Sequence, residues 1–363
     1  MRLIAIGTLA LIVVLGAGVM TQAQMTPSLC EYTPPQNQLQ SLTLSGDYRY
    51  FEDRYLDDRG NASIGHIALQ GIMWAEGPEW SYNLTGSVRL DIAHQLALST
   101  TLMSEGSLRR YLDENLFLFG GVDTASASFQ EGFTVRALGG IGAGRFRDVT
   151  PLAKAMQISQ ALQEAQILTQ PLSESELKAV ADVIARQPEL GVIGVLEGIE
   201  QQLGKPLGAK GIIAIQNIVL SRESHFCGWD ATAAVGYTVI SPIGETNALA
   251  RIAANFATPP DAVSQVLAQA RLYIPLPFTD NMWLTVSASY ARLLMPTANL
   301  NIAYSYNWAR MAGRESQAHN LDATLRLIVS PAWSTVVKGQ ASLATGYEEP
   351  EWSFSIGFEY SLM

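Results

Sequence analysis

Thirteen consecutive residues decide the fold: Trp80-Ser81-Tyr82-Asn83-Leu84-Thr85-Gly86-Ser87-Val88-Arg89-Leu90-Asp91-Ile92. Their even-numbered positions are apolar except for one glycine, and their odd-numbered positions are polar. Side chains of a β-strand point alternately to the two faces of its sheet, so the pattern predicts a strand with one apolar face and one polar face. The stretch is long enough to cross a lipid bilayer at a tilt of about 45°.

The same alternation extends over most of the chain. We expect about six strands in residues 41–145 and about eight in residues 227–363. Short turns separate them, one of which is predicted at Glu105-Gly106-Ser107. The predicted strands lie near 42–50, 62–74, 80–92, 95–104, 109–121, 126–145, 228–241, 246–257, 262–275, 282–294, 298–310, 318–330, 333–345 and 351–362.

Between these two regions the apolar residues recur at helical spacing. Thr150-Pro151 is typical of a helix start, and Ser173 with Glu176 has the spacing of a capping box. Residues 208–223 fit either a helix or a strand. We favour a helix, because one more strand would make the total odd. Residues 146–226 are therefore predicted to form an inserted helical domain.

Alternating strands occur both in soluble β-sandwiches and in transmembrane barrels. In a sandwich the apolar face forms the core, whereas in a transmembrane barrel it faces lipid. The predicted strands run to 11–14 residues, well beyond the usual soluble length of about 5–6. Tryptophans near the strand ends indicate aromatic belts at the membrane surfaces. These are Trp74, Trp80, Trp229, Trp283, Trp308, Trp333 and Trp352. We therefore predict an all-β, transmembrane, antiparallel β-barrel.

The polar face of the predicted strands carries charged residues. Inside a sandwich these charges would need near-complete pairing, whereas a water-filled lumen can solvate them. They could order polar solutes through a transverse field, or they could pair across the lumen and simply fill it. The predicted lumen-lining residues are Asp47, Arg49, Arg89, Asp91, Arg251, Arg271, Asp322, Arg326, Lys338 and Glu359.

The first residues have the pattern of an export signal. Arg2 precedes an apolar run, and Thr21-Gln22-Ala23 fits a cleavage site, so residues 1–23 are predicted to be a signal peptide. A permanent membrane helix is the alternative, although the apolar run is at the short end of what spans a bilayer. Residues 24–40 would then form an arm before the first strand.

This combination of an export signal, alternating strands and an aromatic-rich last strand resembles the outer-membrane β-barrel proteins of Gram-negative bacteria. The resemblance covers roughly 41–145 and 228–362 and identifies no single family. It implies an integral location in the outer membrane, contact with outer-membrane lipid, and insertion by machinery that reads the last strand. The chain departs from the usual terminal aromatic residue, because its apolar register ends at Leu362 and Met363 follows.

Barrels of this class have an even number of strands and keep both chain ends in the periplasm. We expect about 14 strands, within a range of about 12 to 16. About six of them precede the insert, and an even number of crossings returns the chain to the side on which it began. The helical domain is therefore predicted to lie in the periplasm. Cys30 and Cys227 then lie on the same side of the membrane. In an exported protein such a pair can form a disulfide, and two unrelated thiols are the alternative.

Other motifs give weak signals for chemistry. The glycines of Gly139–Gly144 lack the spacing and the βαβ context of a nucleotide site, and predict a strand end where the backbone bends or passes close to the insert. The histidines, His66, His94, His225 and His319, include no metal-spaced pair, and no G-x-S-x-G motif is present. We therefore predict no metal, no cofactor and no enzymatic activity, with His225 as a residue of the barrel rim.

The leading functional interpretation is a passive, porin-like channel for small hydrophilic solutes, restricted by its helical insert. One alternative is a non-conducting structural or assembly barrel whose insert binds a periplasmic protein or the cell wall. Another is an outer-membrane hydrolase. The net charge of −10 argues against nucleic acid as a partner. The sequence leaves the transported solute and the oligomeric state open.

Overall fold

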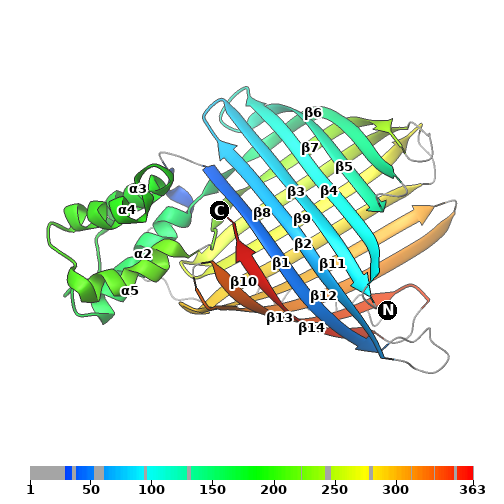
Figure 1. The fold of residues 1–363 in the computed structure, drawn as a ribbon. Helices are drawn as coiled ribbons and strands as arrows, with labels where there is room; N and C mark the ends of the chain where they lie inside the picture. The colour runs from blue at the N-terminus through cyan, green and yellow to red at the C-terminus, as the bar shows by residue number, and fades with distance from the viewer. Residues whose placement is uncertain are drawn as a thin grey trace.

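The chain forms a closed antiparallel barrel of fourteen strands with a helical domain at one end, as a computed structural model shows (Figure 1). Each strand pairs with its neighbours in the sequence, and β1 closes the barrel on β14. The predicted fold class is confirmed. The predicted signal peptide, residues 1–23, lies outside the described residues. These are 29–34, 38–52, 61–93, 96–128, 132–221, 223–241, 247–277, 281–311, 313–330, 332–346 and 350–362.

The strands run back and forth between the two ends of the barrel. Odd-numbered strands begin at the end that carries the helices, which we call the insert-side rim, and the opposite end is the far rim. The strands are β1 (Gln38–Glu52), β2 (Asn61–Glu76), β3 (Trp80–Ala93), β4 (Leu96–Tyr111), β5 (Leu116–Ser128), β6 (Gly132–Asp148), β7 (Phe226–Ile240), β8 (Ala248–Asp261), β9 (Ser264–Leu276), β10 (Met282–Met295), β11 (Ala298–Met311), β12 (Arg314–Ile328), β13 (Trp333–Ala344) and β14 (Glu351–Ser361).

One predicted turn is wrong. Glu105-Gly106-Ser107 lies inside β4, where Glu105 belongs to the lumen face instead of a turn. The chain reverses at residues 112–115, where the carboxylate of Asp113 accepts hydrogen bonds from the backbone N–H groups of Asn115 (2.8 Å) and Leu116 (2.7 Å). An aspartate that bonds its own following backbone favours a tight turn. The fifth strand therefore begins at Leu116 and not near 109.

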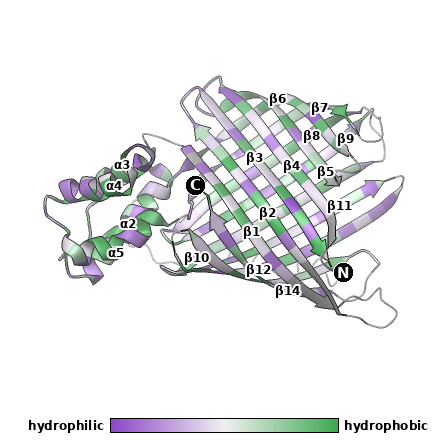
Figure 2. Cartoon of the chain, in the orientation of Figure 1, coloured by the Kyte–Doolittle hydropathy of each residue, from purple (hydrophilic) through white to green (hydrophobic). Residues whose placement is uncertain are grey.

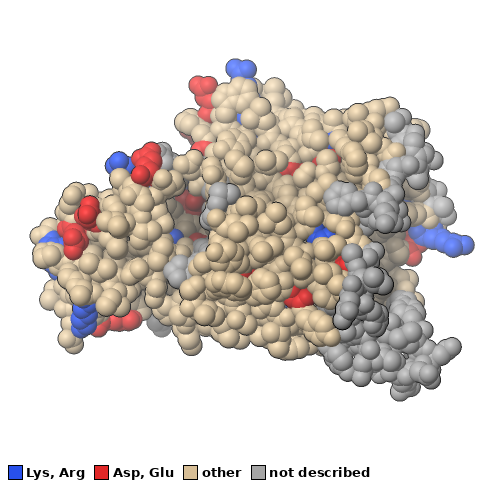
Figure 3. Space-filling model, viewed as in Figure 1, with Lys and Arg blue, Asp and Glu red and all other residues tan. Residues whose placement is uncertain are grey.

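The apolar face of the sheet forms the outer wall of the barrel. In β3 the side chains of Tyr82, Leu84 and Val88 are 39%, 48% and 37% exposed. Hydrophobic and hydrophilic residues alternate along the strands in Figure 2, and the barrel wall in Figure 3 is mostly free of charged side chains. A wall of exposed apolar side chains suits contact with lipid, and closure of the sheet pairs the backbone of every strand.

Four helices occupy the segment between β6 and β7. They are α2 (Thr150–Glu164), α3 (Glu174–Ala185), α4 (Gln187–Leu203) and α5 (Gly208–Leu220). The segment that fitted either a helix or a strand therefore contains a helix. Ser173 and Glu176 form the predicted capping box at the start of α3. Side chains from all four helices make the core of the insert, and Leu152, Val180 and Ile199 are fully buried there.

The arm before the first strand is fixed to the insert. It contains the short helix η1 (Leu29–Glu31), and Tyr32 donates a hydrogen bond from its hydroxyl to Asp182 of α3 (2.9 Å). Leu29 and Tyr32 are buried in the core of the insert. A disulfide joins Cys30 to Cys227 of β7, with Cα atoms 5.4 Å apart. Among the described residues, no helix is long and apolar enough to span a membrane.

Candidate functional site in the barrel lumen

The register of the strands identifies the side chains that face the lumen. Residues directly opposite each other on paired strands point to the same face. In β3 the even-numbered residues, such as Leu84, are exposed on the outer wall, so the odd-numbered Arg89 and Asp91 point inward. Followed around the barrel, this register puts every predicted lumen-lining charge on the inner face, although the side chain of Arg49 is outside the described part.

Several of these charges pair along the barrel wall. Arg326 of β12 donates two hydrogen bonds to Glu359 of β14, at 2.8 and 3.0 Å. Lys338 Nζ lies 3.1 Å from Asp322 Oδ1 on the neighbouring strand. Near the far rim, Asp91 accepts hydrogen bonds from Arg89 Nε and from Ser99 Oγ (both 2.7 Å), and His66 lies 2.6 Å away.

Other ion pairs cross the lumen. Glu105 of β4 binds Arg251 of β8 and Arg271 of β9, each at 3.2 Å. Arg109 of β4 lies 2.8 Å from Asp230 of β7. Because two or more strands separate the partners around the wall, these side chains meet inside the barrel. Sequence analysis missed Glu105, since it placed this residue in a turn, and it named neither Arg109 nor Asp230.

The wall beneath these ion pairs is packed with aromatic side chains. Phe117 of β5 is fully buried, and Phe119 and Tyr111 are 7% exposed. Gly140 and Gly142 of β6 face the same way, and a Cβ atom at either would overlap these phenylalanine rings. The guanidinium of Arg109 lies over the Phe117 ring, 4.8 Å from its centre. The glycine-rich run therefore serves to admit two rings into the lumen wall.

The opposite wall carries short polar side chains. By register, the inner faces of β10 to β14 present mostly serine, asparagine, threonine and alanine. Short side chains fill less space than the phenylalanines of β5. The wider part of the lumen therefore lies along β10 to β14. Polar members of this wall are Thr285, Ser287, Ser289, Asn301, Ser305, Asn307, Asn320, Ser342 and Ser353.

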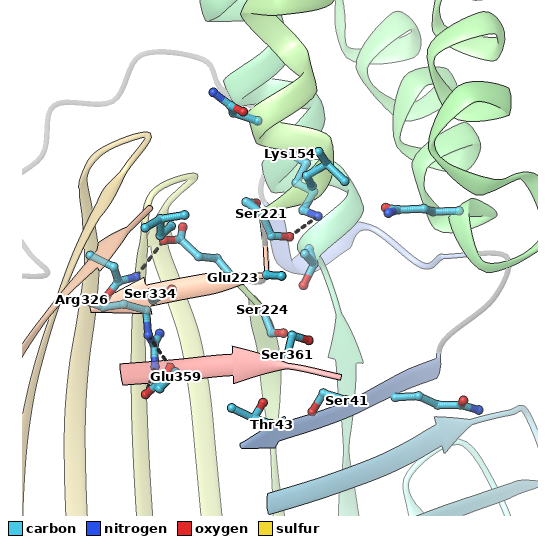
Figure 4. Close-up of a pocket in the computed structure, with 18 of the residues that line it drawn as sticks. Ser41, Thr43, Lys154, Ser221, Glu223, Ser224, Arg326, Ser334, Glu359 and Ser361 are labelled. Atoms are coloured by element: carbon cyan, nitrogen blue, oxygen red, sulfur yellow. Dashed lines mark hydrogen bonds and ion pairs between the residues drawn. The ribbon is translucent and has the colours of Figure 1, made fainter. Parts of the chain in front are cut away.

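A cavity of about 1100 Å³ lies between the insert and the insert-side rim (Figure 4). Its barrel side includes the lumen-facing Thr43, Arg326 and Glu359. Its other side includes Lys154 of α2 and Glu223 of the segment that links α5 to β7. The insert therefore stands over the mouth of the barrel and leaves a space beneath it that both charged and apolar side chains line.

Buried polar contacts hold the insert in this position. Lys154 donates hydrogen bonds from Nζ to the carbonyl oxygens of Val219 (3.0 Å) and Ser221 (2.7 Å). Burial lowers the pKa of Lys154 to about 8, although the nearby carboxylates of Asp148 and Glu223 oppose this shift. Gln157 of the same helix donates a hydrogen bond to the backbone carbonyl of Ala262, in the turn between β8 and β9 (2.6 Å).

Glu223 connects the insert to the wall formed by β10 to β14. It accepts a hydrogen bond from the side-chain amide of Asn299 in β11 (2.8 Å). Burial raises the pKa of Glu223, and Asn299, Arg326 and Lys154 all act against that rise. The ion pair of Arg326 with Glu359 lies in the same cavity, so charged groups of both signs line the mouth.

The histidines have separate environments. His66 contacts Asp91 in the lumen, and His319 lies 2.8 Å from the Tyr304 hydroxyl on the outer wall. His225 is 3% exposed at the junction of insert and β7, and burial lowers its pKa to about 4. His94 lies outside the described residues. Within the described ranges, no cluster of three or more His, Cys, Asp or Glu side chains could hold a metal ion.

The predicted aromatic belt is only partly on the outer wall. Two of its members face inward: Trp74 packs edge-on against Phe226 (5.7 Å between ring centres), and Trp283 stacks on Tyr273 (5.2 Å). Both residues lie near a strand end and therefore at a rim, as predicted. The register of their strands, however, puts their side chains on the lumen face. The outward tryptophans are Trp80, Trp229 and Trp333 at the insert-side rim and Trp308 and Trp352 at the far rim.

Neither a protein-family model nor a curated protein sequence matches the chain. Among solved structures, it is similar to a BenF-like porin from Pseudomonas fluorescens Pf-5, with a TM-score of 0.38 and 8% identity over 90% of this chain and 98% of that one. It is also similar to Pseudomonas putida OprB, with a TM-score of 0.41 and 7% identity over 90% of this chain and 94% of that one. A third similar structure is an outer membrane channel from Pseudomonas putida F1, with a TM-score of 0.39 and 7% identity over 93% of this chain and 100% of that one. At such scores these likenesses carry no functional argument.

Proposed function

We propose that the protein is a passive channel of the outer membrane, through which small hydrophilic solutes cross along the barrel lumen. The observation that carries this proposal is the cavity of about 1100 Å³ beneath the insert, because its barrel side is built from lumen-facing residues such as Thr43 and Arg326. A solute that leaves the lumen at this end would pass through this space. The insert restricts this exit without filling it.

The route follows the wall formed by β10 to β14. Aromatic rings and the ion pairs of Glu105 occupy the side formed by β4 to β9. Short polar side chains line the other side, and charged pairs such as Lys338 with Asp322 lie flat along it. Hydroxyl and amide groups can replace part of the hydration of a polar solute, so this wall favours hydrophilic cargo.

The insert belongs on the periplasmic side in this proposal. β1 begins and β14 ends at the insert-side rim, and single-chain barrels of this class keep both ends in the periplasm. The outer-membrane insertion machinery would then read β14, whose outward residues include Trp352, Phe354 and Phe358. Outer-membrane lipid would contact the apolar wall.

The test is planar-bilayer conductance of the purified full-length protein. We expect stepwise current, and a smaller current for Thr43→Trp, which adds a bulky ring to the mouth. Leu44→Trp is the matched control, because this neighbouring residue faces outward and the same ring would sit against lipid. Electrical silence of the unchanged protein would contradict the channel.

An alternative function is a non-conducting barrel whose insert binds a periplasmic partner or the cell wall. It is favoured by Ile193 of α4 and Ile213 of α5, which are 74% and 69% exposed. Exposed apolar side chains of this size can anchor a partner. Silence in bilayers combined with saturable binding of the full-length protein to purified cell-wall sacculi would support this function over the channel.

A hydrolytic function has less geometric support. His225 would be the natural base at the rim, but at 3% exposure it offers a substrate no access. Its backbone N–H and carbonyl are both bonded to Thr150, so it helps to fix the start of α2.

A further inference from the structure

Six lumen-facing residues near the far rim form a contiguous patch, here called the entry patch. The first row lies directly opposite across β8, β9 and β10, and the second row lies one step deeper across β9, β10 and β11. Opposed residues in such rows have Cβ atoms about 5 Å apart, so one small molecule can touch both rows. The first row is Arg251, Tyr273 and Trp283, and the second is Arg271, Thr285 and Asn307.

The entry patch carries an excess of positive charge. Arg251 and Arg271 share the single carboxylate of Glu105. A neighbouring ion pair of the lumen, Arg136 with Asp123 (3.6 Å), is balanced. Three guanidinium groups therefore face two carboxylates. Such an imbalance attracts an anion into a narrow, partly desolvated passage.

The excess charge is accessible at one residue of the patch. The side chain of Arg251 is 8% exposed and lies over the Phe119 ring, whereas that of Arg271 is 31% exposed. A guanidinium has five N–H donors, and Glu105 can accept hydrogen bonds from only some of those of Arg271. Among the described residues, no further partner of Arg271 is seen.

A second hydrogen-bond donor lies beside Arg271. Thr285 donates a hydrogen bond to the side-chain oxygen of Asn307 (3.1 Å), which leaves the NH₂ group of Asn307 to donate. Within the described residues, no partner is seen for that NH₂ group. Asn307 itself is exposed to the lumen. The second row thus offers hydrogen-bond donors at both of its ends, from Arg271 and from Asn307. A carboxylate, which can only accept hydrogen bonds, could bind between them.

The first row supplies one flat apolar face. The rings of Tyr273 and Trp283 stack on each other, with centres 5.2 Å apart and 14° between their planes, so a solute can reach only the outer face of each ring. On β11 the residue opposite Trp283 is Ala309, whose short side chain leaves room beside the outer face of Trp283. An aromatic or similarly flat solute gains contact area on that face.

We propose that the entry patch is a binding subsite for small carboxylates with a flat apolar body, and that this class is the preferred cargo of the channel. The carboxylate lies against Arg271 and Asn307, and the flat body lies on the outer face of Trp283. This inference rests on the proposed channel function and adds its substrate class. A neutral polar solute would use the donors but gain nothing from the excess charge, and a cation would be repelled.

The test compares three probes that separate the two features. Benzoate has both the charge and the ring, benzamide has the ring alone, and acetate has the charge alone. We would measure binding to the detergent-solubilised full-length protein by titration calorimetry, and block of ionic current by the same probes in planar bilayers. We expect benzoate to bind more tightly than benzamide and acetate, each by about tenfold.

Variants assign the binding to the patch. Arg271→Gln should weaken benzoate by about tenfold, as expected for the loss of one hydrogen bond to a charged group, and leave benzamide nearly unchanged. Trp283→Leu should weaken benzoate and benzamide but not acetate. Arg271→Lys keeps the positive charge and should retain part of the preference for benzoate over benzamide. This result would show that the loss in Arg271→Gln comes from the lost charge and not from misfolding. Lys178→Gln, on the exposed surface of α3, makes the same change in net charge and should have no effect.

The outcomes distinguish this proposal from the channel itself. Equal affinity for benzoate and benzamide, or glucose binding as tightly as benzoate, would overturn the carboxylate subsite. If the protein still conducts ions in planar bilayers, the proposed channel function would stand without it. Benzoate binding that depends on Arg271 in a protein without conductance would support the subsite and remove its role in transport. Insensitivity of benzoate binding to both Arg271→Gln and Trp283→Leu would overturn the proposal.

Discussion

Acid should loosen the helical insert through His225. Its imidazole is buried, and desolvation lowers its pKa from 6.5 to about 4, with Lys154 adding to the shift and Asp261 opposing it. A histidine with a depressed pKa stays neutral in the folded state while the unfolded chain takes up a proton. Stability is therefore lost as pH falls from 6.5 towards 4. At about 1.4 kcal/mol per pH unit, the full window costs about 3 kcal/mol.

The helical circular dichroism signal of the full-length protein in detergent reports on this change, because the described helices lie in the insert apart from the single turn of η1. We expect the urea concentration that removes this signal to fall steadily below about pH 6.5. His225→Gln should flatten that dependence. Glu223 acts in the opposite sense, because its raised pKa adds stability on acidification, so Glu223→Gln should steepen it. An unchanged slope in His225→Gln would refute the reasoning.

Three further predictions concern the barrel and the disulfide between Cys30 and Cys227, here called the clamp. Gly142→Val should destabilise the barrel by about 1–3 kcal/mol in urea because its side chain would overlap Phe117, whereas Gly139→Val, which points into open space, should be tolerated. Glu105→Gln removes the carboxylate shared by Arg251 and Arg271, so the reversal potential in a salt gradient should shift towards anion selectivity, while Glu79→Gln on an exposed turn should not shift it. Cys30→Ser should lower the stability of the insert by about 2–5 kcal/mol without unfolding the barrel, and a urea transition equal to that of the unchanged protein would contradict the clamp.

The sequence predicts the strands well wherever alternation is unbroken. β3, β11 and β14 begin and end within about two residues of their predicted bounds because every second residue is apolar. The predicted boundary between β4 and β5 is wrong because Gly106 and Ser107 are residue types common in turns. The sequence alone does not show that Glu105 forms ion pairs across the lumen. Asp113 and Asn115, which do make the turn, were the better local signal.

The face of a residue is predictable from the sequence, but its partner is not. Alternation alone assigns Arg251 and Arg271 to the polar face. Their shared partner, Glu105, lies 146 residues from Arg251 in the chain. That contact depends on the curvature of the closed sheet and on the stagger of all its strands, which no local pattern encodes. The same limit explains Trp74 and Trp283, whose position near a rim was predicted without the face on which they lie.

Two roles were open for the lumen charges: to order solutes in a field or to fill the barrel. The structure places the pairs differently on the two sides of the barrel. Along β4 to β9, the ion pairs of Glu105 and Asp230 join with Phe117 and Phe119 to occupy space. Along β12 to β14, Arg326 pairs with Glu359 and Lys338 with Asp322 on the same or a neighbouring strand pair. In the proposed channel, filling one side would narrow the passage on the other. A passing solute would then come within reach of wall charges that a wider barrel would leave largely screened by water and salt.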